Sequence, residues 1–164
     1  GYPDYVVLVA FAVYGVVRFG AILQPETQEL LVAEEGSGTW VNNKRLILEN
    51  SCKQKTQELK GSLGKSLREI CGIKNCFSSI KRAGSCGIEY KKIVQGELDF
   101  SFYRRLKPWD HAAGDLIIRE AGGKVAHLNN TSYLLKKTES LDLLCARSED
   151  CWNKVVKILS QFLN

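Results

Sequence analysis

The chain has 164 residues, enough for one ordinary domain with a buried core, and its 45% hydrophobic and 25% charged residues are typical of a globular protein. The net charge of +5 is scattered among 18 acidic residues, with short basic doublets such as Lys91-Lys92 and Arg104-Arg105. This scatter argues against a nucleic-acid partner, which needs a concentrated basic stripe. The longest apolar run, Tyr5 to Val17, is too short to cross a bilayer, so we expect no membrane segment.

The first fifty residues predict an antiparallel meander. Tyr5 to Ala12 and Val16 to Leu23 are rich in β-branched residues and predict two adjacent strands that turn near Gly15. Two further strands are expected at Glu29 to Ala33 and Thr39 to Asn42, because turn-forming Pro, Gly and Asn residues flank them.

After about residue 52 the pattern changes to alternating helices and strands, which predicts a sheet covered by helices. The clearest helix carries an apolar face and ends at Gly122-Gly123. The expected helices are Ser66 to Cys71, 85–95, Asp110 to Ala121 and Cys151 to Phe162, and the expected strands are Phe77 to Ile80, Leu98 to Tyr103, Val125 to Leu128 and Leu141 to Ala146. The fold class predicted is therefore α/β, layered as in α+β proteins.

The six cysteines have no zinc-like spacing, and a chain with this much core does not need disulfides, so we expect reduced structural thiols. No charged segment precedes the first apolar run and no small-residue cleavage site follows it, so we expect a cytoplasmic protein. The chain opens at Gly1 and contains no methionine, from which we expect that it belongs to a longer protein.

The segment Leu106 to Gly114 is the one most suited to chemistry. Asp110 is expected at or next to a helix N-cap, where a carboxylate stays ionised and can turn an oxygen towards a cation. Ala112, Ala113 and Gly114 keep the first turn thin, so that a ligand or a neighbouring backbone can approach closely. The alternative is that Asp110 is a plain helix cap and Trp109 a core aromatic.

The sequence Trp-Asp-x-Ala-Ala-Gly at 109–114, followed by Glu-Ala-Gly-Gly at 120–123, resembles the second signature of the inositol monophosphatase family. Gly84-Ser85-Cys86 is similar to the Gly-Ser-Ala of that family, and the run from Tyr5 to Asn42 is similar to its central meander. The resemblance covers at least residues 1 to 147. It implies the inositol monophosphatase/fructose-1,6-bisphosphatase fold, with an antiparallel meander at 1–50 and an α/β domain at 51–164.

By this resemblance Asp110 is the catalytic, metal-binding aspartate, and Gly84, Ser85 and Cys86 line the substrate pocket. The family often has a hydroxyl-binding glutamate seven residues before the signature aspartate, where this chain has Tyr103. We therefore also assign Tyr103 and the neighbouring Arg104 to the substrate, where a cationic or aromatic wall suits a second phosphate or a flat ring; the alternative is that Arg104 is simply solvated. This departure argues against an inositol ring.

The resemblance implies a Mg²⁺-dependent, Li⁺-sensitive phosphomonoesterase that acts on a small phosphorylated substrate and forms a homodimer. The family's other acidic signature, Asp-Pro-x-Asp-Gly-Thr, is absent from these residues. One aspartate cannot hold two or three Mg²⁺ ions, so we expect the 164 residues alone to be inactive. A non-catalytic RNA- or protein-binding module of the same fold remains the alternative.

Overall fold

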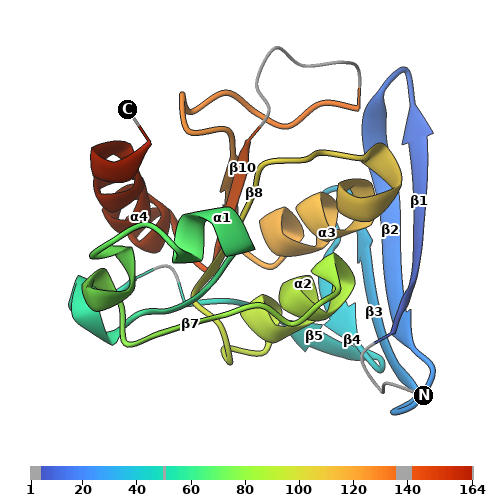
Figure 1. Cartoon of the computed structure of the whole chain (residues 1–164). Helices are drawn as coiled ribbons and strands as arrows, with labels where there is room; N and C mark the ends of the chain where they lie inside the picture. Colours follow the sequence, from blue (N-terminus) through green and yellow to red (C-terminus); the bar gives the residue numbers. More distant parts are fainter. Residues whose placement is uncertain (1–4, 50, 136–141, 164) are drawn as a thin grey trace.

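In a computed structural model of the chain, which describes residues 5–49, 51–135 and 142–163, two five-stranded sheets enclose a layer of helices (Figure 1). The first sheet is a meander in the order β1-β2-β3-β4-β5, and the second has the order β7-β6-β8-β10-β9. This arrangement confirms the predicted combination of an antiparallel meander with a mixed sheet and helices. The predicted division at residue 50 stays a prediction.

The meander contains the four predicted strands and one more. Its strands are β1 (Val7–Val13), β2 (Val16–Gln24), β3 (Glu29–Glu34), β4 (Gly38–Val41) and β5 (Lys44–Leu46). Asn42 and Asn43 both have positive φ, 44° and 66°, which is the geometry of a two-residue hairpin turn. This turn folds Lys44–Leu46 back onto β4 as a strand that the sequence analysis did not predict.

The second sheet is mixed. Its strands are β6 (Lys60–Leu63), β7 (Ser79–Lys81), β8 (Phe100–Tyr103), β9 (Lys124–Ala126) and β10 (Leu143–Ala146). Strand β6 was not predicted, yet it pairs in parallel with both β7 and β8, while β10 is antiparallel to β8 and β9. The carboxyl ends of β6, β7 and β8 therefore meet at one edge of the sheet.

The helices divide into an inner and an outer layer (Figure 1). Helices α2 (Cys86–Val94) and α3 (Pro108–Glu120) lie between the sheets, where α3 packs on β2 and β3 and also contacts β9 and β10. Helix α4 (Glu149–Phe162) covers the other face of the second sheet, on the side of the short α1 (Lys65–Arg68), and 3₁₀ turns occupy Thr56–Glu58 and Ile73–Cys76. No helix in the described ranges is long and apolar enough to cross a membrane.

Small residues in α3 allow its close packing. A Cβ on Gly114 would lie 2.1 Å from Cδ2 of the buried Tyr90 ring, and a Cβ on Gly20 of β2 would lie 2.9 Å from the Ala113 carbonyl oxygen. The small residues that the sequence predicted in the first turn therefore let the β2 backbone and the Tyr90 ring pack closely against α3. This packing fixes α3 against both α2 and the meander.

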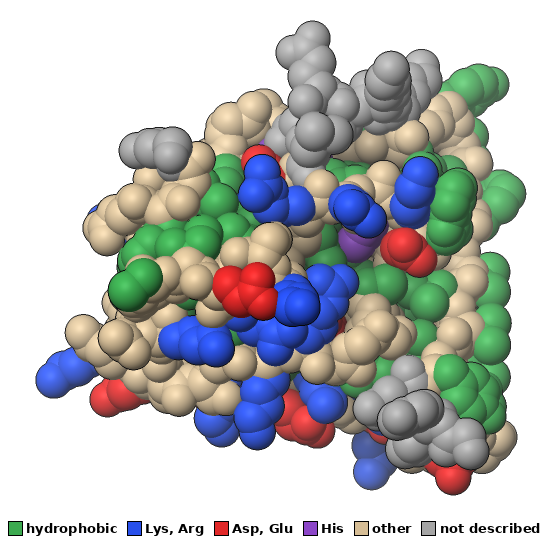
Figure 2. Space-filling view, in the orientation of Figure 1, with side chains coloured by type: hydrophobic (Ala, Val, Ile, Leu, Met, Phe, Trp, Pro, Cys, Tyr) green, Lys and Arg blue, Asp and Glu red, His purple; other side chains and the backbone are tan. Residues whose placement is uncertain are grey.

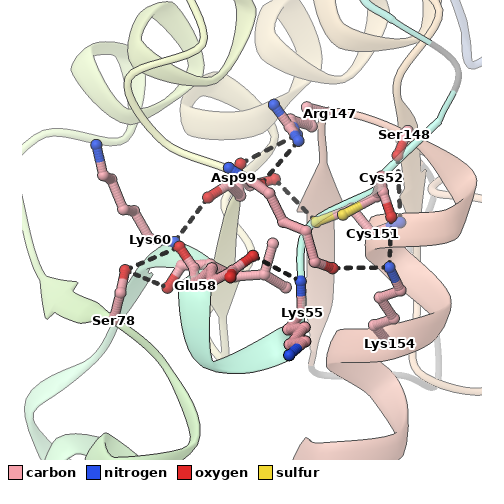
Figure 3. Close-up of polar contacts among 12 residues, drawn as sticks. Cys52, Lys55, Glu58, Lys60, Ser78, Asp99, Arg147, Ser148, Cys151 and Lys154 are labelled. Atoms are coloured by element: carbon pink, nitrogen blue, oxygen red, sulfur yellow. Dashed lines mark hydrogen bonds and ion pairs between the residues drawn. The ribbon is translucent and has the colours of Figure 1, made fainter.

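The amino end of the second sheet is tied together by Asp99 (Figure 3). Its carboxylate accepts a hydrogen bond from the Lys60 backbone N–H at 2.7 Å and pairs with Arg147 Nε at 3.0 Å. Ser148 caps α4 by accepting from the Cys151 N–H at 3.2 Å. All six cysteines are free thiols, among them the buried Cys151. These contacts anchor the end of the sheet opposite the carboxyl ends of β6 and β8.

Strand β1 forms an edge of the meander with apolar side chains turned outwards. Val7, Val9 and Phe11 are 50%, 52% and 60% exposed. Figure 2 shows hydrophobic side chains along the right-hand border, where Figure 1 places β1. This edge is thus an apolar surface that no other part of the described chain covers.

Candidate active site

The residues predicted for the site gather at the carboxyl ends of the parallel strands. The loop after β7 carries Gly84 and Ser85 into α2, and the loop after β8 carries Arg104 into α3. In open α/β sheets ligands bind at such carboxyl edges, where loops and helix N-termini converge. The fold therefore brings together two segments that lie some twenty residues apart in the sequence.

Asp110 occupies the first turn of α3, but it is not the cap. The N-cap position is Lys107, which makes no side-chain capping hydrogen bond, Pro108 is the first helical residue, and Asp110 is the third. The cap prediction was wrong because Pro108 can begin a helix at the position where a missing N–H costs nothing. Trp109 is 71% exposed, so the alternative of a core aromatic was also wrong.

Cys86 links the two loops. It is the first residue of α2, and its Sγ donates to the Asp110 carbonyl oxygen at 3.1 Å. Burial, reinforced by the Asp110 charge, raises the pKa of the Cys86 thiol to about 11, so the thiol stays protonated and remains a donor. Cys86 and Asp110, which were predicted separately for the site, are thus in contact through the Asp110 backbone carbonyl.

A buried carboxylate that sequence reasoning missed holds the Gly84 loop. Glu89 on α2 is 1% exposed, and its Oε1 accepts from Ser62 Oγ at 2.5 Å and from the Ala83 N–H at 3.2 Å. Gly84 follows with φ of 85°, a left-handed conformation that side chains disfavour. The presence of Glu on the buried face of a predicted helix was the available signal for this role.

His111 connects the Asp110 turn to the loop after β8. It is 2% exposed, and its Nδ1 lies 2.7 Å from Tyr90 Oη while its Nε2 lies 3.2 Å from the Arg105 carbonyl oxygen. Burial lowers the pKa of His111, so the neutral ring accepts from Tyr90 and donates to Arg105. His111 is thus an interior residue that supports the loop after β8.

Tyr103 forms the wall behind this loop. Its ring is 4% exposed, and the centroid lies 4.7 Å from that of His111 and 5.8 Å from that of Tyr90. Burial, together with the Glu89 carboxylate, raises the pKa of Tyr103 well above 10, so the phenol is neutral. The position where the family often has a carboxylate is thus uncharged in this chain.

A basic hollow lies beside these residues. This cavity of about 390 Å³ is lined by Lys65, Arg82, Arg104 and Arg105 together with Tyr103, and none of the described residues that line it is Asp or Glu. In Figure 2, Lys and Arg side chains gather at the centre of the face shown. The predicted substrate residues Tyr103 and Arg104 therefore share one cavity at the carboxyl end of β8.

Asp110 and the other described residues around it do not form a metal site by themselves. Among the described residues, no group of three or more His, Cys, Asp and Glu side chains is arranged to hold a metal ion. A Mg²⁺ site needs several converging oxygen ligands. Asp110 is partly exposed and can supply one ligand, so these residues do not suffice for the implied metal centre.

Comparison with solved structures identifies the fold. The IMPase of Thermotoga maritima superimposes with a TM-score of 0.85 and 27% identity, covering 99% of this chain and 63% of that one. The shared fold places the present chain among the inositol monophosphatases by architecture.

Sequence comparison identifies the family. The model of the inositol monophosphatase family matches residues 1–160, and the chain belongs to this family. It is 33% identical to the fructose-1,6-bisphosphatase/inositol-1-monophosphatase of Thermotoga maritima over 130 residues, 76% of this chain and 50% of that protein. It is 32% identical over 148 residues to the Nus factor SuhB of Pasteurella multocida, covering 82% of this chain and 54% of that protein. The chain spans about half the length of the curated relatives it matches.

Proposed function

We propose that this chain forms the substrate-binding part of a metal-dependent phosphomonoesterase. The observation that carries the proposal is the contact between Cys86 and Asp110, which brings the Gly84 loop and the signature aspartate to one edge of the sheet. Membership of the inositol monophosphatase family supports the reaction class. The metal, which we propose to be Mg²⁺, would polarise the phosphate when bound between Asp110 and carboxylates beyond those described here.

The chain's own residues then bind and orient the ester. The first N–H groups of α2 and the Ser85 hydroxyl are suited to phosphate oxygens, because a helix N-terminus leaves donors unpaired and carries partial positive charge. Glu89 fixes this loop through Ala83, and His111 fixes the opposite loop through Arg105. Each loop therefore has a supporting hydrogen bond of its own, and the Cys86 thiol joins the two loops through the Asp110 carbonyl oxygen.

The test is release of inorganic phosphate from a panel of small phosphate esters with Mg²⁺ and with Li⁺ added. We expect no release from the 164 residues alone, and Li⁺-sensitive release from a longer polypeptide that also carries the acidic signature. Sedimentation of the active protein would test the proposed homodimer. If such a polypeptide released no phosphate from any of the esters in the presence of the metal, the proposal would be contradicted.

A role in an RNA-associated assembly is a second candidate, and the earlier expectation of no nucleic-acid partner lacks support from the comparisons. A second hollow of about 450 Å³, lined by Lys60, Lys81 and Lys92 and by one acidic residue, Glu97, shares Arg82 with the basic hollow, so three more lysines lie along this face. The matched relatives include proteins named Nus factor SuhB. Salt-sensitive binding of single-stranded RNA that is lost on removing these lysines would favour this role.

A further inference from the structure

Two buried cysteines meet at the end of the second sheet that lies opposite the candidate active site. Cys52 belongs to the segment between β5 and β6, and Cys151 belongs to the first turn of α4. Their exposed fractions are 4% and 0%, and their thiols are in hydrogen-bond contact. Figure 3 shows the two sulfur atoms next to one another. The proposed phosphatase reaction uses neither residue, so this pair needs an explanation of its own.

Backbone contacts hold the two cysteines beside each other (Figure 3). The Lys154 ammonium on α4 donates to the carbonyl oxygen of Cys52 and, at 2.9 Å, to that of Gln54. On the other side, the Cys151 Sγ lies 3.5 Å from the carbonyl oxygen of Asp99, which precedes β8. The segment that carries Cys52 is therefore fastened to α4 and to the second sheet, and the meeting of the two thiols is a consequence of the fold.

The surroundings of the pair allow the sulfur atoms to come closer. A disulfide has its sulfur atoms about 2.05 Å apart, which is nearer than two thiols in contact. Residues 51–53 lie outside helices and strands, whereas Cys151 is part of α4. The Cys52 segment can therefore shift towards Cys151 while the helix stays in place.

The other thiols contact oxygen atoms. Cys76 donates to a backbone carbonyl at 3.6 Å, Cys86 donates to the Asp110 carbonyl, and the Cys145 Sγ lies 4.0 Å from Tyr90 Oη. Contact between two thiols therefore distinguishes the pair of Cys52 and Cys151 from these three cysteines.

The two members of the pair have different chemical access. Burial raises the pKa of the Cys151 thiol, and the neighbouring Cys52 and the Asp99 charge raise it further. A protonated, buried sulfur reacts slowly with reagents in solution, because the thiolate is the nucleophile. Cys52, in the irregular segment, is the residue that meets an oxidant first, and Cys151 reacts only with the sulfur next to it.

We propose that Cys52 and Cys151 form a reversible disulfide when the protein meets a small-molecule disulfide such as oxidised glutathione. The Cys52 sulfur loses its proton and attacks one sulfur of the oxidant, whose S–S bond breaks to release one reduced thiol that carries the proton. The Cys151 sulfur then loses its proton, attacks the Cys52 sulfur and expels the second reduced thiol. Two protein thiols are oxidised and one small disulfide is reduced, and the inference does not depend on the proposed function.

The disulfide would fasten α4 to the connection between the two sheets. It closes the loop from residue 52 to residue 151, and closing a long loop removes much of the conformational entropy of the unfolded chain. We therefore expect oxidation to raise the Tm by about 5–10 °C.

The test lets the cysteines choose their partners. The chain is unfolded in urea and refolded in a buffer of reduced and oxidised glutathione, so that disulfides exchange before burial protects them. Free thiols are then counted by alkylation in denaturant, and cross-linked peptides are identified by mass spectrometry. We expect the count to fall from six to four because two thiols are consumed, with one peptide pair that joins Cys52 to Cys151. Excess dithiothreitol should restore all six.

Two variants separate this pair from the other thiols. Cys52→Ala should show the same Tm in oxidising and reducing buffer. The matched control Cys71→Ala/Cys76→Ala removes two more accessible thiols and should keep the rise in Tm. Six free thiols in the refolded unaltered chain, a disulfide between other cysteines, or glutathione adducts alone would overturn the proposal. So would an oxidation-dependent rise in Tm that persists in Cys52→Ala. If Cys52→Ala does not fold, the peptide map of the unaltered chain decides the result.

Discussion

Gly114→Ala tests whether α3 is held as tightly as the structure indicates. In a helix interior this change ordinarily stabilises a protein by about 0.5–1 kcal/mol. Here the added Cβ would lie 2.1 Å from Cδ2, 2.2 Å from Cε2 and 2.4 Å from Cγ of Tyr90. Carbon atoms in ordinary contact are about 3.5–4.0 Å apart, so the ring or the helix must move by roughly 1.5 Å.

Neither partner can move freely. The Tyr90 ring is fully buried and its hydroxyl is bonded to His111, and β2 packs on the other side of α3 through Gly20. Overpacking by one methyl group costs about 1–3 kcal/mol. Displacing Tyr90 also weakens the bond to His111, worth about 1 kcal/mol. After the helix-propensity gain, we expect a net destabilisation of about 2 kcal/mol.

The assay is urea unfolding followed by tryptophan fluorescence, with thermal unfolding as a second readout. A loss of about 2 kcal/mol corresponds to a Tm lower by about 4–8 °C in a chain of this size. Repeating Gly114→Ala in a Tyr90→Ala background removes the clash, so the change should then be neutral or stabilising. Because Tyr90→Ala alone should cost about 3–5 kcal/mol, all four proteins are compared in sucrose. The reasoning fails if Gly114→Ala stabilises the unaltered chain, or costs the same in both backgrounds.

Three further changes probe the contacts around the site and the sheet. Glu89→Ala leaves the Ser62 hydroxyl and the Ala83 N–H without their acceptor, so the free energy of unfolding should fall by about 2–5 kcal/mol. Hydrogen exchange of the Ala83 amide should become faster, and an unchanged exchange rate would contradict the role of Glu89 in holding the loop. Burial lowers the pKa of His111 below 6.5, so only the unfolded chain takes up a proton just below that pH. Stability should therefore fall as the pH drops below about 6.5, with a shallower fall in His111→Asn; equal slopes in urea-unfolding series would refute this. Ser148→Ala removes the α4 cap and should cost about 1 kcal/mol in the same assay, and a neutral result would mean that the cap contributes nothing.

The meander was largely predictable because its signals are local. β-Branched runs separated by turn residues predicted β1 to β4, and the predicted ends of these strands lie within one or two residues of the observed ends. Strand β5 was missed although Asn42-Asn43 was recognised as a turn, since the following Lys-Arg-Leu is short and polar. Its stability as a strand comes from pairing with β4, which the local pattern does not contain.

Strand β6 was missed for a different reason. Lys60-Gly61-Ser62-Leu63 has no strand-like composition, yet it lies between β7 and β8. A Cβ on Gly61 would lie 2.1 Å from Cζ of Phe100, so the glycine makes room for a ring forty residues away. Such a requirement is set by tertiary packing and leaves no periodic signal in the sequence.

The candidate site was found through its signature, and its supporting contacts were not. The sequence indicated Asp110 and the Gly84 loop, and the structure shows that the Cys86 thiol joins them by a hydrogen bond to the Asp110 carbonyl oxygen. Glu89 and His111 hold the two loops by bonds to Ala83 and to Arg105, partners six residues away in each case. Their roles depend on burial and on backbone direction, which single-residue patterns do not specify.

Mg²⁺-dependent phosphate release by Asp110→Asn tests the central claim most directly. It is measured in an active protein that contains this chain, beside Asp150→Asn, which removes the same charge from an exposed position on α4. We predict that Asp110→Asn lowers kcat/KM at least on the order of a hundredfold with unchanged thermal unfolding, because a lost metal ligand cannot cost less than a lost supporting contact. Activity of Asp110→Asn within a few fold of the Asp150→Asn control would contradict the assignment of Asp110 to the metal and with it the proposed site.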